Sequence, residues 1–226
     1  MTRCDERPVP GWVPEAFREL YFVAAAKMTA PELDAGHCWD HVERVTRTAL
    51  RLAGEEQADA AVVCAAGLLH DLGRTVPGEG DHARRSVELA PPLLSGTCLS
   101  AHQAALALDA IGDHRYRDGK VPAAIEGKIL QDADRLDAVG AIGIARCFAK
   151  SSVTGRRLYS PDDPFCTAGR EPDDNRYTID HFYSKLLKLK DTFHTASARK
   201  LAERRHAFLT AFLEEMRVEL GASPTA

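Results

Sequence analysis

One apolar segment that ends in two polar side chains constrains the fold of this chain more than any other feature. The run Ala60–Leu69 contains only apolar residues and one glycine, and it leads directly into His70 and Asp71. With Asp59 before it and Gly73 after it, the run predicts a capped helix that is buried on all sides. Burying an imidazole beside a carboxylate is costly unless something replaces the lost water. A bound metal ion would do so, and the segment therefore predicts a metal site at the end of a core helix.

The rest of the chain has the pattern of further helices. Strand signals are weak, because β-branched residues do not gather in alternating runs and no Asn-Gly or Asp-Gly turn joins such runs. We therefore expect an all-α fold. The expected helices besides the apolar one are Pro14–Lys27, Asp40–Gly54, Asp81–Ala90, Ser100–Ile111, Pro122–Gly140 and Ala196–Leu220.

Length and composition limit the classes of protein to which the chain can belong. A chain of 226 residues suits one core, so we expect a single domain over residues 1–226. The net charge of −4 argues against a nucleic acid polymer as partner. No run of about 18 apolar residues is present, which argues against a membrane span, and the N-terminus leads into no apolar signal core. Six cysteines without a Cys-x-x-Cys pair fit a reducing compartment, so we expect a cytoplasmic protein.

Two segments lack helical periodicity. The first is Gly112–Gly119. The second covers residues 155–176 and contains three prolines and four aspartates among its residues. That composition is typical of an irregular surface loop, and we interpret the second segment as a loop or a lid.

Two further segments offer the remaining ligands that a metal site would need. His41 stands near the start of an expected helix, and the acidic segment Gln131–Asp137 contains three aspartates. Imidazole and carboxylate ligands suit Mn²⁺, Fe²⁺, Ni²⁺, Co²⁺ or Mg²⁺. A single buried histidine is more commonly a hydrogen-bonded core residue, but the joint occurrence of these segments favours a metal site.

The acidic segment leaves the choice of aspartate open. Asp134 and Asp137 are three residues apart and would share one helix face, whereas Asp132 would point elsewhere. Four protein ligands would leave open positions on an octahedral ion for water and substrate, which is the layout of a catalytic site.

The chain resembles one bacterial branch of the HD-domain superfamily of metal-dependent phosphohydrolases. The resemblance spans about residues 37–210, and the segment Gln131–Arg146, which reads QDADRLDAVGAIGIAR, is its most specific part. It implies an all-α HD-domain helical bundle with a motif core at about 37–150, completed by C-terminal helices over 177–220. The matching segments are Trp39–Val45, Leu68–Arg74, His114–Arg117, Lys128–Arg146 and Asp180–Leu189.

The resemblance also implies a ligand set and a reaction. In the superfamily the last metal-binding aspartate stands between a small and a basic residue, and Asp134 matches that context. One divalent ion, with manganese among the candidates, would be held by His41, His70, Asp71 and Asp134. Active members hydrolyse phosphate esters or anhydrides, and nucleotides are their best-supported substrates. We therefore expect a metal-dependent phosphatase or nucleotide pyrophosphohydrolase that acts on a small phosphorylated metabolite, as a monomer or homodimer.

Catalysis and substrate binding need further residues. The candidates for catalysis are Asp71, through the ion, and either Asp137 or His114 as the proton-transfer partner. Cations near the motifs are candidates for contacts to the substrate phosphates, although two or three of them are expected to be ordinary surface residues. These cations are Arg44, Arg74, Arg115, Arg117 and Lys128.

Two alternatives remain open at the level of the sequence. The first is a dinuclear HD enzyme, a phosphodiesterase or an iron oxygenase, that recruits His82, His102 or His114 as extra ligands. The second is a regulatory module that binds a phosphorylated ligand without turnover. A count of metal ions per chain separates the mononuclear enzyme from the dinuclear one.

Overall fold

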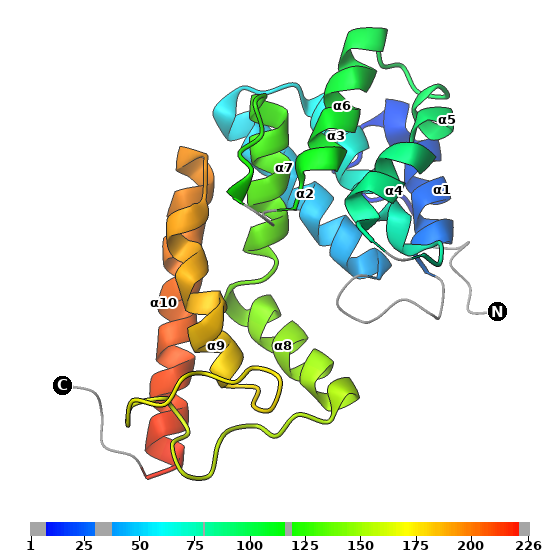
Figure 1. Ribbon diagram of the computed structural model, residues 1–226. Helices are drawn as coiled ribbons and strands as arrows, with labels where there is room; N and C mark the ends of the chain where they lie inside the picture. Colours follow the sequence, from blue (N-terminus) through cyan, green and yellow to red (C-terminus); the bar gives the residue numbers. More distant parts are fainter. Residues whose placement is uncertain (1–7, 30–37, 79, 116–118, 222–226) are drawn as a thin grey trace. The chain divides into compact units, whose positions relative to one another are not determined.

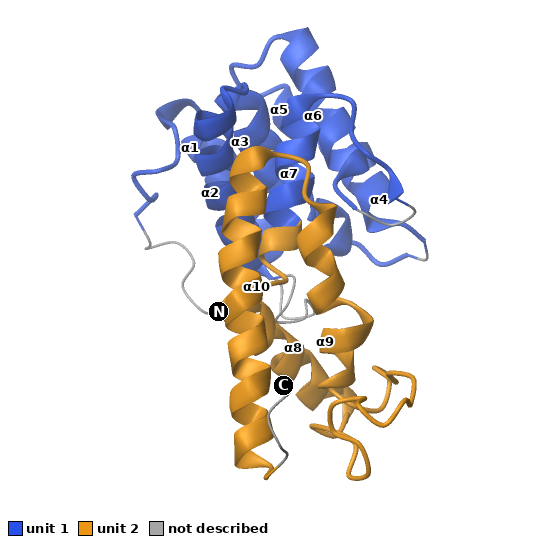
Figure 2. Ribbon diagram, turned by 90° about the vertical axis from the view of Figure 1, so that its left-hand side faces the viewer, with its two compact units in different colours: residues 1–134 blue, residues 135–226 orange. Residues whose placement is uncertain are grey.

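The computed structural model describes residues 8–29, 38–78, 80–115 and 119–221. Across these residues the secondary structure is helical and no β-strand is present, so the expected all-α fold is confirmed. Arg157 and Tyr177 form an isolated bridge. None of the described helices has the length and apolar character needed to cross a membrane. The chain divides into two compact units, residues 1–134 and residues 135–226 (Figure 2).

In the first unit, the described residues form α-helices and short 3₁₀ helices, which are labelled η (Figure 1). The last helix, α7, extends two residues beyond the unit boundary. The elements are η1 (Glu15–Phe17), α1 (Arg18–Met28), α2 (Trp39–Glu56), α3 (Ala60–Leu69), η2 (Leu72–Arg74), α4 (His82–Leu89), α5 (Pro91–Leu94), α6 (Ala101–Asp113) and α7 (Ile125–Leu136).

Helix α3 is the core of this unit and has the bounds that the apolar run predicts. All its residues from Val62 onward are buried, and it packs against α2 and α6 (Figure 1). Asp59 caps the helix, because its side chain accepts a hydrogen bond of 2.9 Å from the backbone N–H of Ala61. Gln103 from α6 donates a bond of 2.8 Å to the same carboxylate. The cap therefore also ties α3 to α6.

Helices α2 and α3 approach each other closely at Gly67. A Cβ atom at this position would lie 2.8 Å from Oγ1 of Thr46, so only glycine fits without a shift. The buried residues of α2 recur at spacings of three and four and include His41, Val45 and Thr46 on one face. Since His70 follows Gly67 by three residues, the close approach brings the end of α3 near the first turns of α2.

The predicted helix over Pro122–Gly140 is wrong in its extent. α7 ends at Leu136, and α8 begins at Gly140. Between them Val139 has extended backbone angles, φ −124° and ψ 159°, and its side chain is buried. The apolar periodicity continues across this break, which explains why the sequence pattern does not reveal it.

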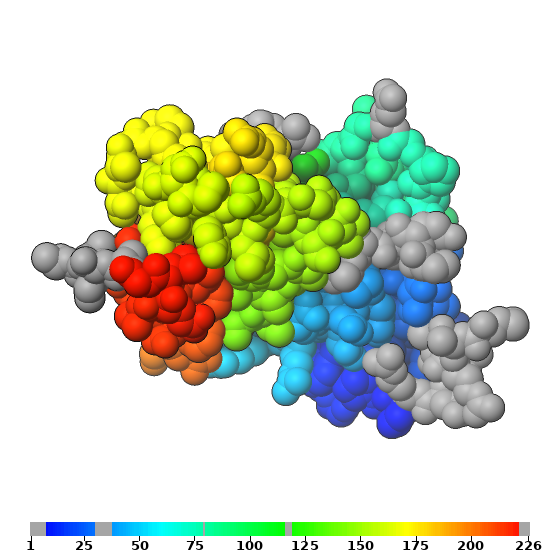
Figure 3. All heavy atoms as spheres, turned by 90° about the horizontal axis from the view of Figure 1, so that it is seen from below, coloured from blue at the N-terminus to red at the C-terminus, as the bar shows by residue number. Residues whose placement is uncertain are grey.

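The second unit contains α8 (Gly140–Thr154), α9 (Asp180–Ser184), η4 (Leu186–Thr192) and α10 (Ala196–Glu219). Helices α8 and α10 pack together, and the rings of Phe182 and Phe212 stack with centroids 5.7 Å apart. Residues 155–179 contain no helix and lie on the surface of this unit beside the C-terminal part of α10 (Figure 3).

Candidate metal centre

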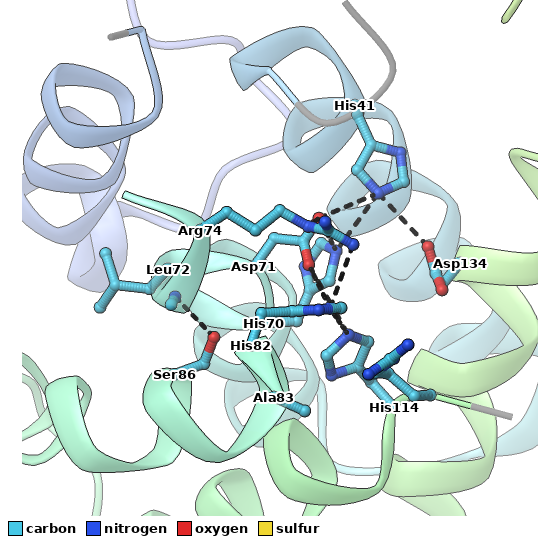
Figure 4. Close-up of polar contacts among 12 residues, drawn as sticks. His41, His70, Asp71, Leu72, Arg74, His82, Ala83, Ser86, His114 and Asp134 are labelled. Carbon is cyan, nitrogen blue, oxygen red and sulfur yellow. Dashed lines mark hydrogen bonds and ion pairs between the residues drawn. The ribbon is translucent and has the colours of Figure 1, made fainter. Parts of the chain in front are cut away.

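The structure brings the four predicted ligands of the metal ion together in the first unit (Figure 4). Nε2 of His41, from α2, lies 3.4 Å from Nε2 of His70 and 3.7 Å from Oδ2 of Asp71. The same nitrogen lies 3.3 Å from Oδ1 of Asp134, which α7 supplies. We call these four residues group one. The first three of them offer ligand atoms that all lie within 4.8 Å of one another.

A second group of ligand atoms surrounds the other oxygen of Asp71. Oδ1 of Asp71 lies 3.1 Å from Nε2 of His82 and 3.7 Å from Nε2 of His114. The two imidazole nitrogens are 3.3 Å apart. We call Asp71, His82 and His114 group two. His82 is the first residue of α4 and His114 follows the end of α6, whereas His102, the third candidate from the sequence, is exposed.

Backbone contacts fix the ring orientation of one histidine in each group. Nδ1 of His70 lies 2.8 Å from the carbonyl oxygen of Gly67, and Nδ1 of His114 lies 2.7 Å from that of Ile111. A carbonyl can only accept, so each Nδ1 carries the proton and the neutral ring keeps its lone pair on Nε2. Both Nε2 atoms lie close to Asp71. The two rings therefore have the tautomer that a metal ligand needs.

Burial and neighbouring charges set the protonation states of the ligands. Burial lowers the pKa of His70 to about 4 and also lowers the pKa of His114. Burial raises the pKa of Asp71, but His70, His82 and Arg74 outweigh it and hold this pKa well below its usual range. At neutral pH the centre thus presents neutral imidazoles and an ionised carboxylate.

Asp134 is more accessible than the other ligands of group one. Its side chain is 31% exposed. Burial raises its pKa, whereas its contact with His41 lowers it, and the net direction is downward. A partly exposed, ionised carboxylate is suited to bind a metal ion at the edge of a substrate site.

The donor set fits a divalent metal ion. Both carboxylate oxygens of Asp71 are buried. The guanidinium of Arg74 lies 2.8 Å from one of them, and the Nε2 atoms of four imidazoles lie within 3.8 Å of the same carboxylate. Imidazole nitrogens and carboxylate oxygens are ligands for Mn²⁺, Fe²⁺ and related ions. The residues present therefore fit the metal that the sequence predicts.

A close packing contact places His82 beside Asp71. The backbone N–H of Gly73 donates a hydrogen bond of 2.8 Å to Oγ of Ser86. A Cβ atom at Gly73 would lie 2.2 Å from the carbonyl oxygen of His82, so no larger residue fits here. The turn after Asp71 thus lies directly on the first turn of α4, which carries His82.

Gln131 has a positioning role that sequence reasoning missed. Its buried side-chain amide donates hydrogen bonds of 2.8 Å to the carbonyl of Asp113, 3.3 Å to that of Arg115 and 3.1 Å to that of Lys120. The first two of these carbonyls flank His114 in the sequence. A polar residue within the apolar face of α7 is the one local signal that could have indicated this role.

The predicted phosphate-binding cations have different environments. Arg74 lies in the centre itself, with Nε 2.8 Å from Oδ2 of Asp71. Arg115 donates a hydrogen bond of 2.7 Å to Asp81, the residue that caps α4. Arg44 is half-buried on α2, one turn after His41.

The remaining predicted site residues lie outside both groups. Lys128 is half-buried on α7, and its ammonium makes no polar contact with the residues that the structure describes. Arg117 lies outside the described residues. Asp137 belongs to the second unit, where its carboxylate accepts a hydrogen bond of 2.7 Å from Arg146. Asp132 is fully buried and belongs to neither group.

The sequence and the fold of this chain are similar to those of known proteins. The family model described as HD domain matches residues 38–139. The uncharacterized protein YpgQ from Bacillus subtilis is 37% identical over 191 residues, which cover 82% of this chain and 85% of YpgQ. The crystal structure of YpgQ in complex with ADP aligns with a TM-score of 0.69 at 32% identity, covering 89% of this chain and 93% of YpgQ. An HD-superfamily hydrolase from Bacillus thuringiensis aligns with a TM-score of 0.69 at 32% identity, covering 91% and 98% of the two chains.

Proposed function

This chain belongs to the HD-domain family, and from that premise we propose that it is a metal-dependent hydrolase of phosphoric esters or anhydrides with a nucleotide as substrate. The observation that carries the proposal is the buried carboxylate of Asp71, which lies within 3.8 Å of the Nε2 atoms of four histidines, His41, His70, His82 and His114. The complex of its relative YpgQ with ADP supports a nucleotide as the ligand.

We place one divalent ion in group one. When bound, the ion would polarise a phosphoryl oxygen and lower the pKa of a bound water molecule. Nε2 of His114, with its lone pair directed towards Asp71, would accept a proton from the attacking water. We favour His114 over Asp137 for this role, because the carboxylate of Asp137 is already paired with Arg146.

Positive charge near the centre would bind the phosphates of the substrate. Among the residues that the structure describes, the guanidinium of Arg115 pairs with the carboxylate of Asp81, which is 49% exposed. An exposed ion pair contributes about 0–1 kcal/mol, so Arg115 can exchange this partner for a phosphate at little cost. Arg44 and Lys128 are the other candidates, from α2 and α7 respectively. A guanidinium can bind a phosphate with two parallel hydrogen bonds, and an ammonium acts as a point charge.

A substrate panel tests this function directly. Nucleoside mono-, di- and triphosphates are incubated with the Mn²⁺-loaded protein, and the release of orthophosphate and of pyrophosphate is measured. In water labelled with oxygen-18, the label should enter a phosphate product. Oxygen consumption without phosphate release would instead identify an oxygenase, and no release from any nucleotide would contradict a nucleotide substrate.

Variants of the two cations test the phosphate contacts. Arg115→Ala and Lys128→Ala should each lower turnover about 30- to 1,000-fold, which corresponds to about 2–4 kcal/mol of transition-state stabilisation. Their metal content should not change. Arg84→Ala is the matched control, because Arg84 is 83% exposed on α4 and pairs only with Glu88. Equal turnover in Arg84→Ala and Arg115→Ala would exclude Arg115 from the substrate site.

A dinuclear enzyme is the second candidate function. Group two shares Asp71 with group one, so one carboxylate could bridge two ions through its two oxygens. Such a centre would serve a phosphodiesterase or, with iron, an oxygenase. Two ions per chain after metal loading would support this candidate.

A further inference from the structure

The guanidinium of Arg74 contacts both ligand groups. Its Nε lies 2.8 Å from Oδ2 of Asp71, on the side of group one. Its Nη2 lies 3.1 Å from Nε2 of His82, in group two. Figure 4 shows the side chain passing over Asp71 towards the ring of His82.

The contact between Arg74 and His82 involves Nε2 of His82, which is the atom that would have to bind a second metal ion. Arginine has only N–H donors and stays protonated in proteins. Nε2 of His82 lies 3.1 Å from Nη2 of Arg74 and 3.1 Å from Oδ1 of Asp71. Without a proton it accepts from Arg74, which uses its lone pair, and with a proton it donates to Asp71 and has no lone pair to offer. A ring nitrogen in either state cannot bind a metal ion at the same time.

Charge acts in the same direction. The guanidinium of Arg74 contacts both Asp71 and His82, and its positive charge would repel a cation bound between these two residues. The guanidinium of Arg74 therefore already supplies a positive charge beside group two. Unlike a metal ion, it cannot act as a Lewis acid.

Group one, unlike group two, loses no lone pair to Arg74. Arg74 contacts this group through Oδ2 of Asp71, and each carboxylate oxygen has room for a second partner. Within the described structure, His70 and Asp134 have no polar contact with Arg74. Their ligand atoms stay available to an ion.

We propose that Arg74 limits the centre to one divalent ion. It leaves group one to the metal and keeps His82 and His114 free of metal, so that they can act on the substrate. The inference rests on the proposed function, because it assumes that group one binds a divalent ion.

A count of bound Mn²⁺ tests the inference without any assay of activity. The protein is saturated with Mn²⁺ and desalted, and the metal content per chain is measured by elemental analysis. We expect one ion in the unmodified protein and two in Arg74→Met, which removes both the charge and the donors. Electron paramagnetic resonance should show spin coupling between the two Mn²⁺ ions in the variant alone.

Control variants connect the second ion to group two. Arg74→Met combined with His82→Ala should return the count to one. Arg74→Lys keeps the charge and should also bind one ion, as should Arg84→Met on the exposed face of α4. If Arg74→Met does not fold, Arg74→Gln removes the same charge and should bind two ions.

The possible counts separate the inference from the function on which it rests. Two ions in the unmodified protein, or one ion in a folded Arg74→Met or Arg74→Gln protein, would overturn the role of Arg74 but leave the hydrolase proposal intact. No bound ion in the unmodified protein would overturn both.

Discussion

Two buried carboxylates, one in each unit, differ in how their charge is balanced. Asp180, in the second unit, is 0% exposed and receives a hydrogen bond of 2.7 Å from Nη2 of Arg170 and one of 2.6 Å from the backbone N–H of Asp173. Asp71, in the first unit, is 1% exposed; it pairs with Arg74 at 2.8 Å, and its other near neighbours are four imidazole nitrogens within 3.8 Å. The difference shows that burial alone does not identify a functional carboxylate.

The partners of each carboxylate indicate its role. Asp180 belongs to a closed network that holds the irregular segment before α9, so its contacts are complete within the protein. Asp71 has imidazole nitrogens around both of its oxygens, which a salt bridge with Arg74 does not use and which a metal ion would bind together with the carboxylate. We therefore interpret Asp180 as structural and Asp71 as a metal ligand.

The largest expected effect is on metal binding. Asp71→Ala should abolish both Mn²⁺ retention and turnover, because Asp71 is common to both ligand groups. The free energy of unfolding of the metal-free variant should also fall, because Arg74 loses the carboxylate with which it pairs. Elemental analysis and urea denaturation measure the two quantities. Full metal occupancy in the variant would disprove the assignment of Asp71.

Replacing Asp180, the carboxylate that we interpret as structural, should lower stability without lowering metal binding. Asp180→Asn should lower the free energy of unfolding by about 3 kcal/mol, because it leaves the guanidinium of Arg170 without its charged partner. The metal content per folded chain should stay at the level of the unmodified protein. Urea denaturation monitored by circular dichroism gives the stability. A loss of metal together with a small change in stability would reverse the roles that we assign to the two carboxylates.

The smallest expected effect is a pH dependence that belongs to the first unit. Burial lowers the pKa of His70 from 6.5 to about 4, so the unfolded chain binds the proton more tightly between these values. The metal-free protein should therefore be most stable above pH 6.5 and lose stability as the pH falls towards 4. The loss from this group is about 3 kcal/mol at most, since each unit of pKa shift corresponds to about 1.4 kcal/mol.

Urea denaturation in the presence of a chelator at several pH values measures this slope. His70→Asn should reduce the slope, and the part that remains comes from other histidines whose pKa burial lowers, such as His114 and His181. An unchanged slope in His70→Asn would show that His70 is not the group that titrates.

Strong local signals explain why much of the fold and of the site could be predicted. The helix over Ala60–Leu69, its cap at Asp59 and the position of His70 at its end follow from an unbroken apolar run and a capping residue. The boundary of α7 was missed because the apolar periodicity runs through Val139 although the backbone leaves the helical conformation there. The apolar pattern of a sequence predicts which face of a helix is buried more reliably than it predicts the residue at which the helix ends.

The sequence by itself determined the all-α fold class, the type of ligand atoms and the order in which the ligands occur along the chain. Only the tertiary structure decided that His82 and His114, and not His102, lie beside Asp71, and that Arg74 contacts the ligands themselves. These distances depend on contacts between elements far apart in the sequence, such as Gly67 against α2 and Gly73 against α4. Side-chain periodicity within one helix carries no information about such contacts, because it shows which face is buried and not which partner lies opposite.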